Sequence, residues 1–178
     1  MITEFSVHPK PRNNNAKIAF LITFLISCAG FVTYFFMERF RGLVGLFSLM
    51  MLVTAILFYT KYISPVFYYD ITFDSEGTPI FVVRKRVGKR ETTLCRIDIA
   101  DIVSVNHEMR AERRAHKTPS GMLKYVYAPT MFPSDVYRIT VKGRYEKSEI
   151  IIEASEEFSE LLRNYSEEAR LMRLSGEE

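Results

Sequence analysis

A short run of basic residues offers the chain's most direct chemistry. Five of the seven residues from 84 to 90 are positively charged, and Gly88 interrupts them. In an extended strand Arg84 and Arg86 share a face, where two guanidinium groups could bind phosphate oxygens. The candidate contacts for anions or anionic lipid headgroups are Arg84, Arg86, Lys89 and Arg90. The alternative is a solvated turn whose charges protect a sheet edge.

Other reactive residue types lack the spacing that catalysis or metal binding requires. His8, His107 and His116 are scattered, and no Cys-x-x-Cys, Gly-x-Ser-x-Gly or glycine-rich phosphate motif is present. Cys95 falls within an expected strand, where a cysteine usually serves as a small apolar residue. We therefore predict no enzymatic activity, no cofactor and no metal site.

A second basic cluster lies in the polar run 109–120, which we predict to be a loop. No aromatic residue lies between Met109 and Met122. Nucleic-acid binding by stacking needs aromatic side chains interleaved with positive charge. The run therefore argues against a nucleic-acid partner.

Two apolar runs, residues 18–36 and 42–60, precede the part of the chain that carries these residues and are expected to hold it at a membrane. Each is 19 residues long and contains no Asp, Glu, Lys, Arg or His. A helix of this length spans roughly 28 Å, close to the hydrocarbon thickness of a bilayer. The five-residue connection predicts an antiparallel transmembrane hairpin at 17–62, preceded by an N-terminal tail, 1–16. Residues that would let the helix backbones approach closely are Thr23, Ser27, Gly30, Gly45, Ser48 and Ala55.

Charges near the runs indicate their orientation. A cleaved lipoprotein signal, with Cys28 as the acylated cysteine, is an alternative to the first helix, but strong apolarity continues to Phe36. Basic residues outside the hairpin are Lys10, Arg12, Lys17 and Lys61, against Arg39 and Arg41 in the connection. This excess predicts a multi-pass membrane protein with both termini in the cytoplasm. The two cysteines form no disulfide framework, which agrees with a reducing compartment.

Residues 63–178 change to alternation with a period of two, typical of half-buried strands. Seven strands are predicted, at 66–73, 78–86, 90–96, 102–108, 121–127, 135–141 and 147–153. The period then becomes helical over 156–173. The apolar stripe of that helix comprises Phe158, Leu161, Leu162, Tyr165, Ala169 and Met172.

This order resembles the bacterial PH-like domains, of the pleckstrin-homology superfold, that follow a transmembrane hairpin. The sequence YDITFDSEG at 69–77 is similar to that group's first strand and turn, and IDIADIVSV at 97–105 to its entry into the fourth strand. The resemblance implies an α+β domain, a seven-stranded antiparallel bent sheet or partly open barrel capped by a C-terminal helix. Lipid-binding eukaryotic PH domains use a first-strand lysine for inositides, whereas strand 66–73 contains no Lys or Arg.

These features and the resemblance together predict a non-catalytic, membrane-anchored, protein-binding or scaffolding module at the cytoplasmic face of a bacterial membrane, the inner (plasma) membrane. The expected partner is another protein or a further copy of the chain. One alternative is a module that senses anionic lipid. Another is an accessory subunit of a membrane transporter or signalling complex.

Overall fold

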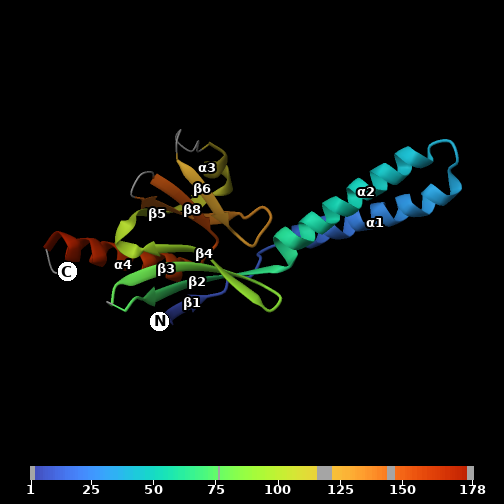
Figure 1. Cartoon of the computed structure of the whole chain (residues 1–178). Coiled ribbons are helices and arrows are strands. Elements are labelled where there is room, and N and C mark those ends of the chain that lie inside the picture. Colours follow the sequence, from blue (N-terminus) through green and yellow to red (C-terminus); the bar gives the residue numbers. More distant parts are fainter. Residues whose placement is uncertain (1–2, 76, 116–121, 144–146, 176–178) are drawn as a thin grey trace. The chain divides into compact units, whose positions relative to one another are not determined.

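The computed structural model describes residues 3–75, 77–115, 122–143 and 147–175 (Figure 1). The chain forms two compact units. One unit comprises Pro11–Pro65 together with Thr130–Phe132, and the other comprises the remaining segments, Met1–Lys10, Val66–Pro129 and Pro133–Glu178.

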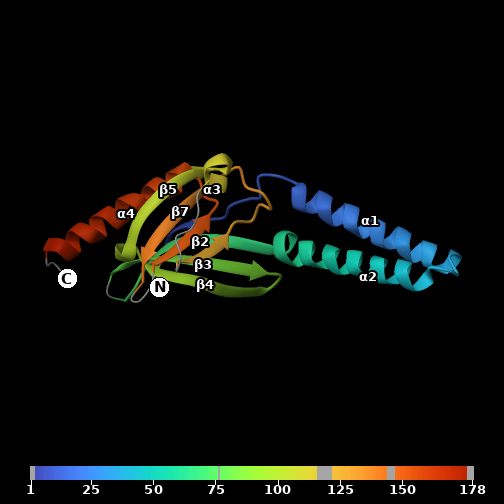
Figure 2. The same ribbon diagram turned by 90° about the horizontal axis from the view of Figure 1, so that it is seen from above.

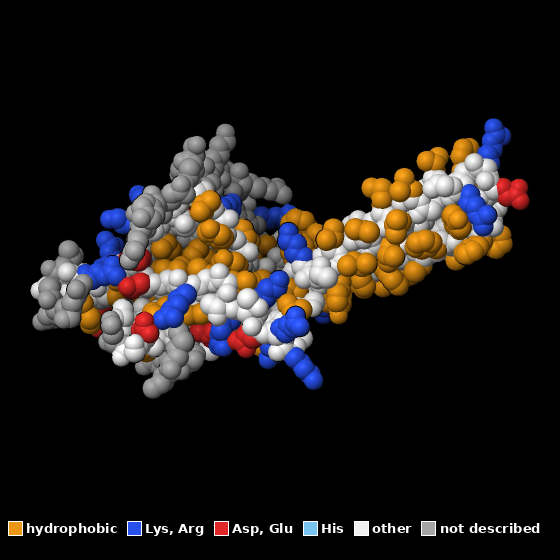
Figure 3. All heavy atoms as spheres, in the orientation of Figure 1, with side chains coloured by type: hydrophobic (Ala, Val, Ile, Leu, Met, Phe, Trp, Pro, Cys, Tyr) orange, Lys and Arg blue, Asp and Glu red, His pale blue; other side chains and the backbone are white. Residues whose placement is uncertain are grey.

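The first unit is an antiparallel helical hairpin, as the apolar runs predict. It consists of α1 (Asn15–Phe36), α2 (Arg41–Phe58) and a final π-helical turn, η1 (Tyr59–Ile63). Both helices are long and apolar enough to cross a membrane. Hydrophobic side chains cover the outside of the hairpin along its length (Figure 3).

Small residues hold the two helices together. The Ser27 hydroxyl donates a hydrogen bond of 2.9 Å to the Ser48 carbonyl, and both residues are buried. A Cβ atom at Gly30 would overlap the Ser48 hydroxyl, so only glycine permits this approach. Ala55 is buried on the same helix as Ser48. These contacts confirm the predicted close packing at Ser27, Gly30 and Ser48, whereas the Thr23 hydroxyl donates within its own helix.

The second unit contains two four-stranded sheets. Sheet A has the order β1-β2-β3-β4, from β1 (Thr3–Val7), β2 (Pro65–Phe73), β3 (Pro79–Val87) and β4 (Arg90–Asp98). Sheet B has the order β5-β7-β8-β6, from β5 (Ile102–Met109), β6 (Leu123–Tyr127), β7 (Asp135–Lys142) and β8 (Lys147–Ile152). The helical elements are η2 (Ile99–Asp101), α3 (Arg110–Ala115) and α4 (Glu156–Ser175).

One hydrophobic core joins both sheets and α4. Sheet A contributes Tyr69 and Phe81, sheet B contributes Ile139, and α4 contributes Phe158 and Leu162. The Tyr69 hydroxyl donates to the Tyr127 carbonyl, and it accepts a hydrogen bond of 3.3 Å from the backbone N–H of Glu153. Burial raises the pKa of Tyr69, so this phenol stays protonated and keeps its donor.

The structure corrects the predicted fold in several places. The described residues form eight strands rather than seven, because residues of the expected tail form β1, which pairs antiparallel with β2. The sheets are not uniformly antiparallel, since β6 runs parallel to β8. In the polar run 109–120, Met109 ends β5 and residues 110–115 form α3 rather than a loop, while residues 116–120 lie outside the described part. Met172 is 48% exposed, so the buried stripe of α4 ends at Ala169.

Candidate functional site

The four basic residues predicted to bind anions separate into two pairs. Arg84 donates through Nε to Asp70, whose side chain is only 1% exposed, and through an Nη atom to Glu91 at 2.6 Å. The Ser6 hydroxyl also donates to Asp70. Bonding to Asp70 raises the pKa of Arg84. Arg84 is thus an internal counter-ion for a buried carboxylate.

An aromatic side chain occupies the face that Arg84 and Arg86 share. The Arg86 guanidinium lies 5.3 Å from the centre of the Tyr68 ring, and that of Arg84 lies 5.8 Å from it. The His8 ring packs against Tyr68 with centroids 5.2 Å apart. These contacts fix the two arginines along the sheet instead of directing both at one phosphate.

Lys89 and Arg90 form the second pair and are exposed at the β3–β4 turn. Gly88 adopts φ +60° there, a conformation that glycine takes without strain. β2 and β3 are neighbours joined by a short turn, in which the Asp74 N–H donates to the Thr78 carbonyl at 3.0 Å. Such a connection makes the strands antiparallel. The β3–β4 turn therefore lies at the same end of sheet A as Pro65, the first residue of β2.

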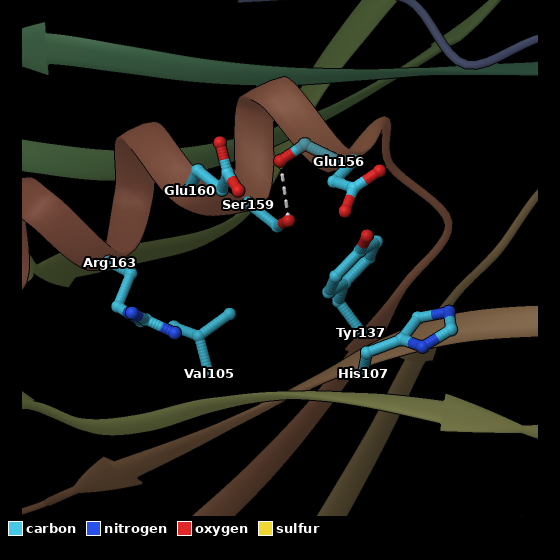
Figure 4. Close-up of a pocket in the computed structure, with 7 residues that line it drawn as sticks. All are labelled: Val105, His107, Tyr137, Glu156, Ser159, Glu160 and Arg163. Atoms are coloured by element: carbon cyan, nitrogen blue, oxygen red, sulfur yellow. Dashed lines mark hydrogen bonds between the residues drawn. The ribbon is translucent and has the colours of Figure 1, made fainter.

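A groove beside β5 was not predicted from the sequence. It has a volume of about 260 Å³ and lies between sheet B and α4, which runs along β5 (Figures 2 and 4). Its lining residues are Val105 and His107 of β5, Tyr137 of β7, and Glu156, Ser159, Glu160 and Arg163 of α4. Alternation in the sequence indicates which face of a strand is apolar but not which strand lies at a sheet edge.

The groove has an aromatic floor and a charged wall. The His107 and Tyr137 rings pack with centroids 5.1 Å apart. On α4 the Ser159 hydroxyl donates to the Glu156 carbonyl at 2.7 Å (Figure 4). Glu156, Glu160 and Arg163 are exposed along the same helix, so the wall carries both signs of charge. This chemistry suits hydrogen bonding and apolar contact with a bound chain.

Metal-binding groups are spread apart in this unit. Among residues 3–75, 77–115, 122–143 and 147–175, no group of three or more His, Cys, Asp or Glu side chains could hold a metal ion. Asp98 accepts a hydrogen bond of 3.0 Å from the Ala100 N–H and pairs with Arg173 at 2.7 Å. These contacts link η2 to the end of α4 and give Asp98 a structural role.

Comparison of the chain with protein-family models, with curated proteins and with solved structures finds no match.

Proposed function

We propose that this chain is a non-catalytic, membrane-anchored module with a PH-like domain that binds a partner protein at the cytoplasmic face of a bacterial membrane. In this account the hairpin spans the membrane, with both termini in the cytoplasm. The partner contributes an extended segment that lies along β5 and fills the β5–α4 groove. The observation that supports the proposal most strongly is the edge position of β5 beside this groove.

An edge strand recognises an extended segment through its backbone. Within the described residues β5 pairs only with β7 in sheet B, so its other side can accept a further strand. Added strands gain affinity from main-chain hydrogen bonds and specificity from pockets for alternate side chains. Here Val105 and His107, two residues apart on β5, line the same groove and would contact such alternate side chains.

The size of the groove favours a peptide over a small molecule. Pockets that enclose drug-sized ligands measure roughly 300–1,000 Å³. The groove measures about 260 Å³ and is open along the helix. It can therefore take one or two side chains of a longer segment, whose backbone remains on the strand edge.

Contact with anionic lipid is a second candidate function, and the position of the β3–β4 turn favours it. Lys89 and Arg90 are exposed at the end of sheet A that follows directly from η1. Basic residues near an anionic leaflet gain about 1 kcal/mol each. Arg84 and Arg86 are not part of this proposal, because Asp70, Glu91 and Tyr68 already engage them.

Crosslinking in native membranes tests the protein-binding proposal. A photo-reactive amino acid replaces His107 in the groove or Val126 on the opposite edge strand, β6, in the full-length chain. We expect a discrete crosslinked product from position 107 and not from position 126. Val105→Lys should remove that product, because a charged side chain then occupies the groove.

The matched control is Asn106→Lys, which adds the same charge one residue along β5, on the other face. It should leave the position 107 product intact. Identical products from both edge strands, or a product insensitive to Val105→Lys, would contradict the proposal.

A further inference from the structure

The loop between β6 and β7 reaches the base of the helical hairpin. Its residues Thr130–Phe132 belong to the same compact unit as α1 and α2. The Arg12 backbone N–H donates to the Thr130 hydroxyl at 3.0 Å, and the Asn13 side-chain amide donates to the Phe132 carbonyl at 3.4 Å. Thr130 is buried in this contact region. The loop is therefore fixed to the segment that leads into α1.

This attachment sets the level of Phe132 along the hairpin. Asn13 precedes Ile18, the first residue of the apolar run, by five positions, and α1 begins between them at Asn15. At the same end of the hairpin the rings of Phe20 and Tyr59 lie 5.8 Å apart, and Lys61 lies over the Tyr62 ring. Aromatic and basic residues of this kind mark the headgroup level of a membrane-spanning helix.

Phe132 is an apolar aromatic residue presented at that level. Its side chain is 50% exposed, although its backbone is held by Asn13. Pro129 and Pro133 flank the attached tripeptide and are both buried. Proline restricts the backbone on each side of the tripeptide, so Phe132 loses little conformational entropy when it contacts lipid.

We propose that the loop around Phe132 is a membrane-interface anchor, in which the ring inserts between lipid headgroups at the boundary with the acyl chains. The occupant is lipid, because the loop is bound to Arg12 and Asn13, which lead into α1 at the end of the hairpin that carries the interfacial aromatic and basic residues. This inference rests on the proposed membrane anchoring. The loop between β6 and β7 would then contact the membrane in addition to the two helices.

Tryptophan fluorescence provides the test, because the natural chain contains no tryptophan. Single-tryptophan versions of the full-length protein carry Phe132→Trp, Phe24→Trp near the middle of α1, or Leu171→Trp on the exposed end of α4. Each is reconstituted into vesicles whose lipids are brominated either near the headgroup or deep in the acyl chain. Quenching reports which depth the indole reaches.

We expect the Phe132→Trp indole to be quenched more by the shallow bromines than by the deep ones. Phe24→Trp should show the reverse order, and Leu171→Trp should not be quenched. Quenching at Phe24→Trp without quenching at Phe132→Trp would overturn the loop anchor and leave the membrane-spanning hairpin intact. Absence of quenching at both positions would overturn both. An indole at position 132 that is shielded from water but not quenched indicates a protein contact and also rejects the lipid anchor.

Discussion

Replacing Arg138 with methionine should lower the free energy of unfolding by about 3–5 kcal/mol, a large share of the roughly 5–15 kcal/mol that stabilises a domain. Arg138 lies on β7 and is almost completely buried. It donates to both carboxylate oxygens of Glu108 on β5, at 2.6 and 2.7 Å, and to Glu149 on β8. The substitution removes the guanidinium that bridges these two buried carboxylates.

Urea denaturation of the full-length protein measures this effect, with Cys95 as the reporter in a Cys28→Ala background. Cys95 is half-buried on β4, and burial raises the pKa of its thiol, so a maleimide reacts slowly until the domain unfolds. Arg163→Met is the matched control. The Arg163 side chain forms an exposed pair with Glu167 at 3.6 Å, worth about 0.3–0.5 kcal/mol.

A triple variant separates the loss of charge from the loss of packing. Adding Glu108→Gln and Glu149→Gln to Arg138→Met removes the buried carboxylates along with their counter-ion. This variant should recover much of the lost stability, because neutral amides cost less to bury than carboxylates without their guanidinium. If Arg138→Met and Arg163→Met unfold at the same urea concentration, the account of this network is wrong.

The second large effect concerns the basic residues of β3 and the β3–β4 turn, and it distinguishes Arg84 from the pair Lys89 and Arg90. Arg84→Met should cost about 2–4 kcal/mol, because Asp70 stays buried without its counter-ion. Lys89→Ser with Arg90→Ser should change stability by less than about 0.5 kcal/mol per residue, since both side chains are exposed. The Cys95 assay measures all three substitutions.

The substitutions should affect lipid contact in the opposite way: the change at Lys89 and Arg90, which hardly alters stability, should weaken contact with anionic lipid. An environment-sensitive dye at Val87→Cys, in full-length protein lacking its natural cysteines, reports on the β3–β4 turn in nanodiscs of neutral or anionic lipid. We expect the dye emission to indicate less exposure to water in anionic discs than in neutral discs. Lys89→Ser with Arg90→Ser should abolish the difference by removing about 2 kcal/mol of attraction. If the dye emission is equal in both lipids when Lys89 and Arg90 are present, the lipid contact is rejected. If Arg84→Met is as stable to urea as the unsubstituted protein, the structural role of Arg84 is rejected.

Local periodicity was sufficient to predict most elements of the fold. Each predicted strand overlaps one of β2–β8, because a half-buried strand alternates in sequence whatever its partner is. The strand β1 escaped prediction because it is short and its partner, β2, follows only after the whole hairpin. Such a pairing depends on the tertiary structure, and strand propensity alone does not specify it.

The buried charges illustrate what alternation cannot predict. Arg138 and Glu149 occupy the polar positions of their strands, which alternation assigns to solvent. The structure buries both faces of these strands, so the two residues instead form part of an internal ion network. The same limit applies to Arg84. The sequence shows which face of its strand Arg84 occupies. Its pairing with Asp70 could be identified only once the structure showed that β2 and β3 are neighbours in sheet A.

Cysteine labelling in intact bacterial cells tests most directly whether the hairpin spans the membrane and holds the domain in the cytoplasm. In a background with Cys28 and Cys95 replaced by alanine, one variant carries Phe40→Cys between the helices and another carries Leu171→Cys on α4. A membrane-impermeant maleimide should label Phe40→Cys in intact cells and Leu171→Cys only after the cells are permeabilised. Labelling of Leu171→Cys in intact cells, or protection of Phe40→Cys until permeabilisation, would contradict this arrangement.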